Sequence, residues 1–390
     1  MKWFKRFLVA GLIALAGAAV YVFGILPGSV GKNMNGVRTT PPYTVSTEAT
    51  TLHQSLVIAD LHADSLLWSR DLSRKGRWGQ VDIPRLREGN VAIQAFTAVT
   101  KSPEGQNIHA NASDARDKIT QLVMAQRWPV RTWGSLKERA LYQAERLHRL
   151  TEEDSDFLLL RTRGDVDELL SRRAENPRVL GAFLGIEGLH CLEGNADNLD
   201  VLIEAGYRMM GPTHFFDNEM GGSAHGESGE GLSEFGREII AEMDAQEIII
   251  DLAHVSSAMI DDILALTSRP VVVSHTGVRG TCDNPRNLSD AHIDAIAEKG
   301  GLIGIGLWKT AVCGTDATAT VAAMKYVADR VGTDHVTLGS DFDGAITAPF
   351  DVTGFPLITE ALLAAGYSDE DIGKMMGGNV RNFLRNNLPE

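Results

Sequence analysis

The chain is poor in cysteine and in positive charge. Its three cysteines, Cys191, Cys282 and Cys313, have no CxxC spacing, so neither a thiolate zinc site nor a dense disulfide framework is indicated, although one disulfide stays open. Lys and Arg number 37 against 51 Asp and Glu, and the resulting net charge of -14 argues against a nucleic-acid partner. The first strand signal is followed by His-Ala-Asp instead of a glycine-rich phosphate turn. The chemistry of the chain must therefore come from histidines and carboxylates.

A long apolar run near the N-terminus is the clearest targeting signal. Residues Phe7 to Leu26 carry no charge and, as a helix, are long enough to cross a bilayer core of about 30 Å. Three basic residues among the first six precede the run, and a basic flank stays in the cytoplasm, which predicts that the rest is exported to the periplasm or the cell exterior. We favour an uncleaved anchor at residues 1–26, because apolar residues continue past a small-residue site at Ala16–Ala18. A protein secreted after signal cleavage is the alternative.

The composition changes after this run. Residues 27–50 are rich in Gly, Pro, Thr and Ser, and we interpret them as a linker. Residues 51–390 are long and apolar enough to form one large folded domain.

Short runs of β-branched and apolar residues alternate with helical patterns through this domain. Eight strands are predicted, at Leu56–Asp60, Val91–Val99, Val179–Gly185, Tyr207–Pro212, Ile248–Leu252, Val271–Ser274, Leu302–Leu307 and His335–Gly339. Such alternation predicts a parallel sheet, and eight units predict an α/β fold of the (β/α)8 TIM-barrel type. An open doubly wound sheet is the alternative.

The segment from about residue 101 to 178 is too long for a simple connection between the second and third strands. Helical periodicity at residues 112–128 and 136–150 predicts a helical insertion in the barrel. Trp128 and Trp133 are expected to be packing residues there.

Histidines and carboxylates follow six of the predicted strands. They are His62 and Asp64 after the first, Glu187 after the third, His214 after the fourth, His254 after the fifth, His275 after the sixth, and Asp341 and Asp343 after the eighth. Because active-site residues of such barrels gather at the carboxyl ends of the strands, we expect these side chains to meet. Imidazoles together with carboxylates suit Zn²⁺ better than Ca²⁺ or Mg²⁺.

Each of these residues also has an ordinary structural interpretation. A lone histidine is more often a core or surface residue than a ligand, and Asp64 is suited to cap a helix. The common position at the ends of six strands is what favours a metal site. The histidines in helical or linker contexts, His53, His109, His148 and His292, are expected to be structural.

In this order the motifs resemble those of the membrane (renal) dipeptidase family, which comprises zinc enzymes of the amidohydrolase type. The resemblance runs from Asp60 to about Arg385, and the glycine-rich stretch Asp217–Gly236 looks like the bacterial branch. The motifs that carry it are Asp60-Leu-His-Ala-Asp64, Gly185-Ile-Glu-Gly188, Thr213-His214, Asp251-Leu-Ala-His-Val255, Pro270-Val-Val-Val-Ser-His275, Pro285-Arg286-Asn287 and Gly339-Ser-Asp-Phe-Asp-Gly344.

The resemblance implies a dipeptidase with two Zn²⁺ ions in each chain. His62 and Asp64 would bind one ion, His254 and His275 the other, and Glu187 would bridge them. A bridging carboxylate holds two cations together and reduces their mutual repulsion. The ions would activate a water molecule and polarise the scissile carbonyl.

The resemblance also implies the substrate contacts. Asp341 would transfer protons as a catalytic residue, and His214 would contact the substrate and the tetrahedral intermediate. Arg286 would bind the terminal carboxylate, which its planar fork can hold through both oxygens. Such a contact favours dipeptides, because a longer peptide places a neutral amide there.

Two alternatives to a dipeptidase remain open at this stage. One is a related dinuclear amidohydrolase that acts on N-acyl amino acids or lactams, and the other is a membrane-tethered binding barrel without catalysis. Trp308 stands where family members carry another aromatic, so the preferred side chain stays undefined, as does the role of the 217–236 loop. A homodimer is kept open as the assembly.

Overall fold

A nine-stranded sheet, parallel at every pairing of its strands, forms the centre of the molecule. The computed structural model describes residues 2–390, so only Met1 of the predicted anchor lies outside the described residues. The strands are β1 (Ile58–Ala63), β2 (Val91–Val99), β3 (Phe157–Leu159), β4 (Leu180–Glu187), β5 (Tyr207–Gly211), β6 (Ile249–Ile250), β7 (Val272–Thr276), β8 (Leu302–Ile305) and β9 (Val336–Leu338). Their order is β6-β5-β4-β2-β1-β9-β8-β7, with β3 beside β4.

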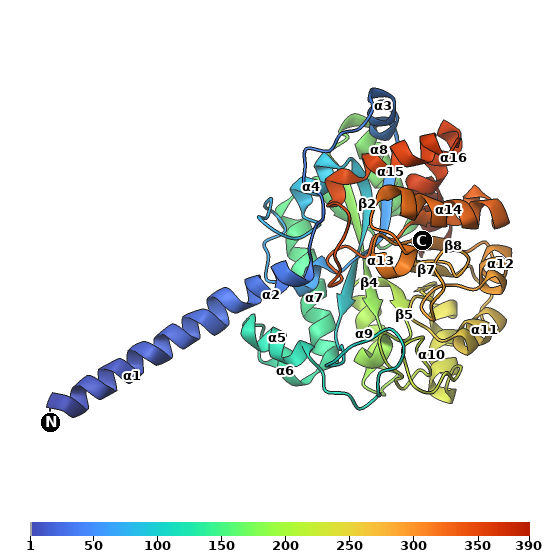
Figure 1. Ribbon diagram of the computed structural model, residues 1–390. Helices are drawn as coiled ribbons and strands as arrows, with labels where there is room; N and C mark the ends of the chain where they lie inside the picture. Colours follow the sequence, from blue (N-terminus) through green and yellow to red (C-terminus); the bar gives the residue numbers. More distant parts are fainter. Residues whose placement is uncertain (1) are drawn as a thin grey trace.

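The sheet curls so that its two edges approach each other. Asp251, just after β6, makes a parallel bridge to Val272 of β7, and the Leu252 amide donates to the Val272 carbonyl oxygen at 2.8 Å. Helices surround the strands (Figure 1). The predicted parallel α/β architecture is confirmed, and its curled sheet is consistent with a TIM-type barrel.

Most helices begin at a side-chain cap that the sequence supplies. The larger helices after the strands are α4 (Ile83–Glu88), α9 (Asn198–Glu204), α10 (Glu234–Ala245), α11 (Ser257–Leu266), α12 (Asp290–Glu298), α14 (Ala317–Val331), α15 (Pro356–Ala364) and α17 (Asn379–Asn387), with short α13 (Lys309–Val312) and α16 (Asp369–Gly373). The N-cap oxygens of Ser233, Ser256 and Ser289 accept backbone N–H groups of the first turns of α10, α11 and α12. Such caps satisfy amides that a helix itself leaves without partners.

The region between β2 and β4 contains four helices and the short strand β3. The helices are α5 (Ile119–Ala125), α6 (Arg131–Gly134), α7 (Leu136–Glu153) and α8 (Arg163–Glu175). Trp128 is buried and packs on Tyr142 of α7, as expected of a packing residue, whereas Trp133 is 36% exposed.

The two ends of the sheet have different surroundings. Near the amino ends of the strands, Phe383 and Leu384 of α17 join an apolar cluster with strand residues such as Leu61 and Phe183. The carboxyl ends carry the histidines and carboxylates described below. Apolar side chains therefore close the sheet at the amino ends of its strands, and the reactive side chains lie at the carboxyl ends.

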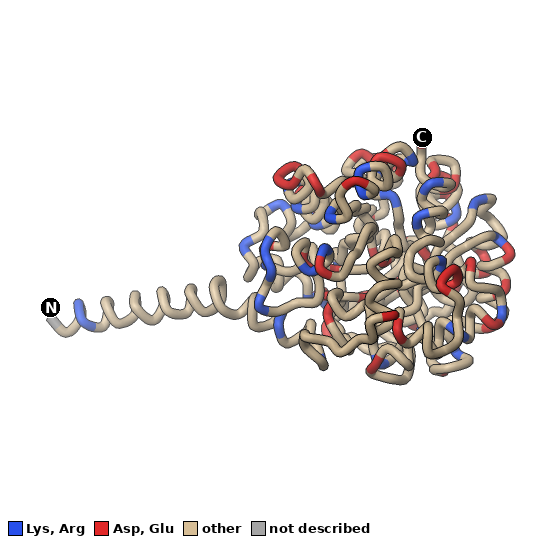
Figure 2. Tube along the Cα trace, turned by 90° about the horizontal axis from the view of Figure 1, so that it is seen from above, with Lys and Arg blue, Asp and Glu red and all other residues tan. Residues whose placement is uncertain are grey.

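The N-terminal segment is a helix that projects from the body of the protein (Figure 1). It comprises α1 (Lys2–Val20), a π-helical turn (Tyr21–Ile25) and α2 (Leu26–Met34). Among residues 2–390, the stretch Trp3–Met34 is the one helix long and apolar enough to cross a membrane, and its apolar window is not buried in the protein. Charged residues lie near the start of this helix and over the body, with few between (Figure 2). Such a helix could be a membrane anchor or a signal sequence.

Residues 27–50, expected to form a linker, contain most of α2 and the start of α3 (Thr47–Ser55). Pro27 lies in the first turn of α2, where its missing N–H removes no helical hydrogen bond. Pro27 and Gly31 are buried against the body, so this part of the segment packs on the domain.

Candidate metal and substrate site

The end of β1 supplies the first two site residues. His62 is the penultimate residue of β1 and is fully buried, and Asp64 follows directly. The Asp64 amide donates to the Phe342 carbonyl oxygen at 2.9 Å, and Thr97 donates its hydroxyl to Asp64 Oδ1 at 2.6 Å. These bonds fix Asp64 at the mouth of the sheet, and Ser274 Oγ, 3.1 Å from His62 Nδ1, orients the imidazole.

Glu187, the last residue of β4, lies at the centre of the site. Its Oε1 is 3.2 Å from His62 Nε2, 3.2 Å from His254 Nε2 and 3.3 Å from His275 Nε2. Its Oε2 is 3.1 Å from His214 Nε2. One carboxylate, supplied by one strand, therefore faces imidazoles from four other strand ends.

This cluster fits a divalent cation. Among the described residues, His62 Nε2 and Glu187 Oε1 are buried and make no hydrogen bond. Three sets of potential ligand atoms lie within 4.8 Å of one another, and they are His62 with Glu187 and His275, Glu187 with His214 and His254, and His62 with Asp64 and Asp341. Convergent imidazole nitrogens and carboxylate oxygens are the donors that Zn²⁺ and related ions prefer.

The charges in the site shift one another's pKa values. Burial raises the pKa of Glu187, but the surrounding histidines, His214 foremost, outweigh burial and hold it well below its usual range. Burial lowers the pKa values of His254 and His275 well below the usual value, so both imidazoles are neutral. Burial, together with Asp64 and Glu187, raises the pKa of Asp341 well above its usual range. Burial lowers the pKa of His62, but Glu187 and Asp64 outweigh burial and hold this pKa well above its usual value. The cluster thus combines a carboxylate with imidazoles of different basicity.

Three backbone positions around the site are strained. His254, Asp341 and Asp343 have φ values of 65°, 60° and 58°, in the left-handed region that non-glycine residues seldom adopt. Such strain persists only where the surrounding structure fixes the residue, and it is frequent at functional sites.

Asp341 and Asp343 have different environments. Both side chains line the central cavity, and Asp341 lies there beside His62 and Asp64. Asp343 is fully buried and accepts hydrogen bonds from the Ser65 hydroxyl, the Gln80 amide and the Arg70 guanidinium. Asp343 therefore holds the loop after β9 in place.

His225 belongs to the site and is absent from the residues selected by sequence. Its Nε2 is 3.1 Å from His254 Nδ1, and its Nδ1 is 2.9 Å from the Ile108 carbonyl oxygen. Because a carbonyl oxygen only accepts, His225 carries its proton on Nδ1, and its Nε2 accepts from His254 Nδ1. His254 Nε2 then carries a lone pair instead of a proton, and it lies 3.2 Å from Glu187 Oε1 and 2.9 Å from His275 Nε2. His225 lies in the 217–236 loop, and the glycine-rich composition of that loop is the one sequence signal that points to this region.

Arg286 is held by the backbone around β7. Its two terminal nitrogens donate to the His275 carbonyl oxygen at 2.7 Å and to Thr276 Oγ1 at 3.4 Å. Its Nε has no hydrogen-bond partner among the described residues. The guanidinium is buried and lines the same cavity as Glu187.

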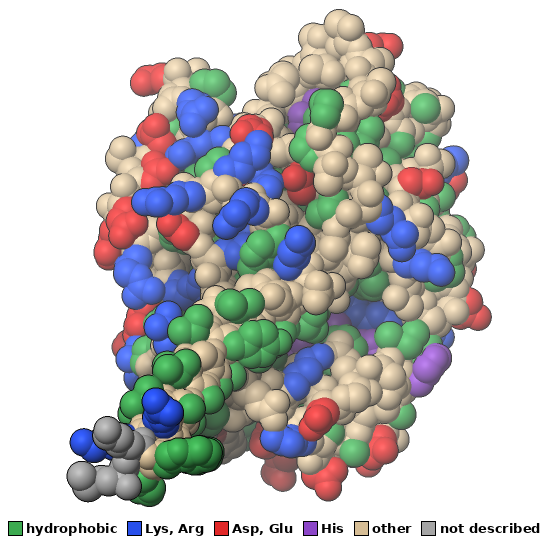
Figure 3. Space-filling view, turned by 60° about the vertical axis from the view of Figure 1, so that its left-hand side comes forward, with side chains coloured by type: hydrophobic (Ala, Val, Ile, Leu, Met, Phe, Trp, Pro, Cys, Tyr) green, Lys and Arg blue, Asp and Glu red, His purple; other side chains and the backbone are tan. Residues whose placement is uncertain are grey.

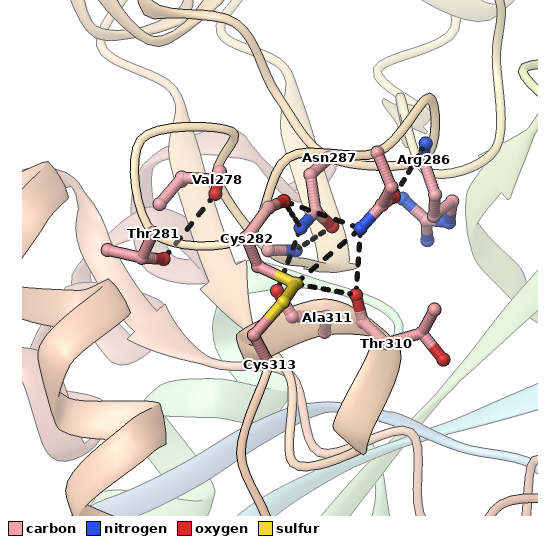
Figure 4. The surroundings of a disulfide bond; sticks show 10 residues. Val278, Thr281, Cys282, Arg286, Asn287, Thr310, Ala311 and Cys313 are labelled. Carbon is pink, nitrogen blue, oxygen red and sulfur yellow. Dashed lines mark hydrogen bonds between the residues drawn. A yellow bond between two sulfur atoms is a disulfide. The ribbon is translucent and has the colours of Figure 1, made fainter.

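A disulfide between Cys282 and Cys313 supports the loop that carries Arg286 (Figure 4). Asn287, next to Arg286, donates to the Cys282 and Ala311 carbonyl oxygens at 2.6 and 2.8 Å. The single disulfide that the sequence left open is thus present in the structure, while Cys191 is buried and free.

A cavity of about 340 Å³ connects these residues. Its polar end is lined by Asp64, Glu187, His214, His254, His275, Arg286 and Asp341, and Trp308 borders it. Histidine side chains are visible at the floor of a hollow beside the base of the projecting helix (Figure 3). Seven of the eight side chains expected to meet line this cavity, and the eighth, His62, lies 3.2 Å from Glu187.

The fold and the site are those of a metal-dependent hydrolase on a curled parallel α/β sheet. A sequence model of the membrane dipeptidase family, peptidase family M19, matches residues 46–387. The chain belongs to this family, which confirms the resemblance seen in its motifs.

Individual relatives agree with this assignment. The chain is 29% identical over 349 residues to the dipeptidase aclJ of Aspergillus oryzae, covering 84% of this chain and 77% of that protein. It is 30% identical over 323 residues to the dipeptidase verJ of Clonostachys rogersoniana, covering 80% of this chain and 76% of that protein.

Solved structures share the fold. A crystal structure of a dipeptidase of family M19 superposes with a TM-score of 0.69 at 25% identity, covering 86% of this chain and 100% of that one. A metallopeptidase from Rhodobacter sphaeroides, bound to a phosphinate mimic of the dipeptide L-Ala-D-Ala, superposes with a TM-score of 0.69 at 24% identity, covering 85% and 99%.

Proposed function

We propose that the chain is a zinc-dependent dipeptidase that binds two Zn²⁺ ions and hydrolyses the peptide bond of dipeptides. The observation that carries the proposal is Glu187, whose two oxygens lie 3.1 to 3.3 Å from the Nε2 atoms of four histidines in the cavity that also contains Arg286. A dipeptide substrate is supported by the family and by the dipeptide mimic bound to the Rhodobacter sphaeroides protein.

Five residues are proposed as metal ligands. His62 and Asp64 would hold one ion, His254 and His275 the other, with Glu187 between them. When bound, zinc supplies Lewis acidity, which lowers the pKa of water and polarises a carbonyl group. His225 keeps the proton of His254 on Nδ1 and so directs the Nε2 lone pair into the site.

The remaining residues are proposed to act on the substrate. Arg286 binds its terminal carboxylate, since the guanidinium is already oriented by His275 O and Thr276. His214 donates a hydrogen bond to the developing oxyanion, and a donor placed in this way lowers the barrier substantially. Asp341, as the carboxylate, takes a proton from the attacking water, becomes the neutral acid and gives the proton to the leaving amine.

The N-terminal helix is proposed to anchor the protein, with the catalytic domain on the exported side. A cleaved signal is the alternative. The disulfide supports export, because such bonds persist in oxidising compartments. The linker, the helical insertion at about 101–178 and a homodimer stay predictions.

The substrate class is tested with a panel of dipeptides and N-acetyl amino acids, assayed with bound metal measured in parallel. We expect hydrolysis of the dipeptides, and we expect Glu187→Ala to lose both metal and turnover. Cleavage of the N-acetyl amino acids alone would favour the related amidohydrolase activity. Full activity in Glu187→Ala would refute the bridging role.

A further inference from the structure

One part of the cavity lining, the apolar end, consists of side chains that pack in or against a single apolar cluster. Apolar side chains line it, namely Val30, Met34, Leu67, Trp68, Val99, Ile119 and Leu122. Lys118 and Gln106, which bond to each other, border it. A cavity with one polar and one apolar end fits a ligand that has a charged and an apolar part.

Two of the apolar residues, Val30 and Met34, belong to α2, the helix that continues the membrane-spanning segment. α2 lies directly on the domain at Gly31. A Cβ added to Gly31 would be 2.3 Å from a ring carbon of Trp78 and 3.1 Å from one of Trp68. Because only glycine allows this approach, α2 is seated against two indole rings and forms a fixed wall.

The end of α2 is tied to the loop that carries Asp341. The buried Asn35 donates from its side chain to the Gly31 carbonyl oxygen at 2.9 Å and accepts from the Ala345 amide at 2.9 Å. The Ala348 amide then donates to the Gly36 carbonyl oxygen at 2.9 Å. Hydrogen bonds therefore connect the end of α2, the helix that carries Val30 and Met34, to the loop that carries Asp341.

The apolar side chains and Arg286 follow strands that are not neighbours in the sheet. Leu67, Trp68 and Val99 follow β1 or end β2, whereas Arg286 follows β7. In the sheet, β9 and β8 separate β1 from β7. If Arg286 holds the carboxyl-terminal residue of a dipeptide, the amino-terminal residue extends towards the apolar end.

We propose that α2 is part of the substrate-binding site, and that the cavity end formed with Val30 and Met34 binds an apolar side chain of the amino-terminal residue of the dipeptide. This rests on the proposed dipeptidase function. The segment that joins the protein to the membrane is thereby a specificity element of the enzyme. Val30 and Met34 lie beyond the small-residue site at Ala16–Ala18, so the wall is retained whether or not the signal is cleaved.

The test is a selectivity ratio measured on the full-length zinc-loaded protein. The ratio is kcat/KM for phenylalanyl-alanine divided by kcat/KM for glycyl-alanine. The two dipeptides have the same carboxyl-terminal residue and differ in the side chain of the amino-terminal residue. Val30→Trp fills the apolar end, and we expect the ratio to fall at least ten-fold, since even one methylene in an apolar pocket changes selectivity by about 10-fold or more. Met34→Ala removes contacts without filling space, and a fall of at least about three-fold is expected.

Asn33→Trp is the matched control, because Asn33 is exposed on the same helix, and its ratio should equal that of the unaltered protein. An unchanged ratio in Val30→Trp overturns the proposal, even if both rates fall together. If Val30→Trp does not fold, an unchanged ratio in Met34→Ala overturns it instead. Failure of the unaltered protein to cleave either dipeptide would refute the dipeptidase function itself, which distinguishes the two outcomes.

Discussion

At the scale of single residues, the site depends on which imidazole atoms face Glu187. Ser274 Oγ lies 3.1 Å from His62 Nδ1 and 3.0 Å from His275 Nδ1, so both rings present Nε2 to the carboxylate. The sequence was sufficient to predict that these side chains meet, because each lies at or directly after a recognisable strand. It did not reveal His225, whose loop has no periodicity, or the structural role of Asp343, which depends on contacts with Arg70 and Gln80 far away in the chain.

Replacing His225 should weaken metal binding while leaving the fold intact. In His225→Ala, His254 loses the acceptor that fixes its tautomer, and loss of such an outer partner lowers metal affinity by about 10- to 100-fold. Competition titration with a chelator measures this, and added zinc should restore most of the turnover. His148→Gln is a suitable control, since His148 bonds only the Ala205 carbonyl oxygen. Equal zinc affinity in both variants would contradict the positioning role.

His53 should make stability depend on pH. It is buried between Thr359 Oγ1 and the Gly89 carbonyl oxygen, and burial lowers its pKa from 6.5 to about 4. Above pH 6.5 the imidazole is neutral in both folded and unfolded chains. As the pH falls from 6.5 to 4, only the unfolded chain gains this proton, so the free energy of unfolding falls, by about 3 kcal/mol in full. Denaturant titrations at several pH values should show a smaller fall in His53→Gln, and an equal fall would exclude His53 as the cause.

At the scale of elements, the pattern of the sequence located eight strands and the parallel arrangement, because each buried strand is a short apolar run ended by a turn. β3 was missed because it lies within the segment that helical periodicity assigned to an insertion. The helix α2 was missed because Gly, Pro and Ser are typical of linkers. Its stability comes from contact with Trp68 and Trp78, which no local pattern reveals.

The loop that bears Arg286 should loosen when its disulfide is removed. The bond joins residues separated by 31 positions, and closing such a loop stabilises a fold by about 3–4 kcal/mol on chain-entropy grounds. In Cys282→Ala combined with Cys313→Ala, we expect a lower thermal midpoint and a KM for dipeptides raised more than kcat is lowered. Cys191→Ala serves as the control, since this cysteine is free. A change in kcat alone would contradict a role in binding the carboxylate.

At the scale of the whole molecule, the projecting helix has an apolar surface and the body has a charged one. The helix α2 connects the two. The family match begins at residue 46, so it does not cover α2 or its contacts with the cavity. The sequence indicated the long apolar N-terminal helix and the parallel α/β domain separately. The contact between them could not be predicted from the sequence, because Asn35 and Gly36 bond to a loop more than 300 residues away in the chain.

Two truncations should separate the membrane segment from the catalytic domain. Removal of residues 1–25 leaves α2, so the protein should stay folded and hydrolyse dipeptides at near its original kcat/KM. Removal of residues 1–36 also removes α2 and Asn35, which exposes Trp68 and Trp78 to solvent. We expect a lower thermal midpoint and aggregation for the second protein, measured by light scattering. Equal stability of the two proteins would show that α2 adds nothing to the fold.

The most direct test of the account is a zinc titration of the metal-depleted protein, followed by elemental analysis and by dipeptide hydrolysis on the same samples. Clustering of His62, Asp64, His254 and His275 around Glu187 predicts that two zinc ions bind per chain and that turnover returns as they bind. Full dipeptide hydrolysis by the metal-depleted protein, or a chain that binds no zinc, would contradict the account.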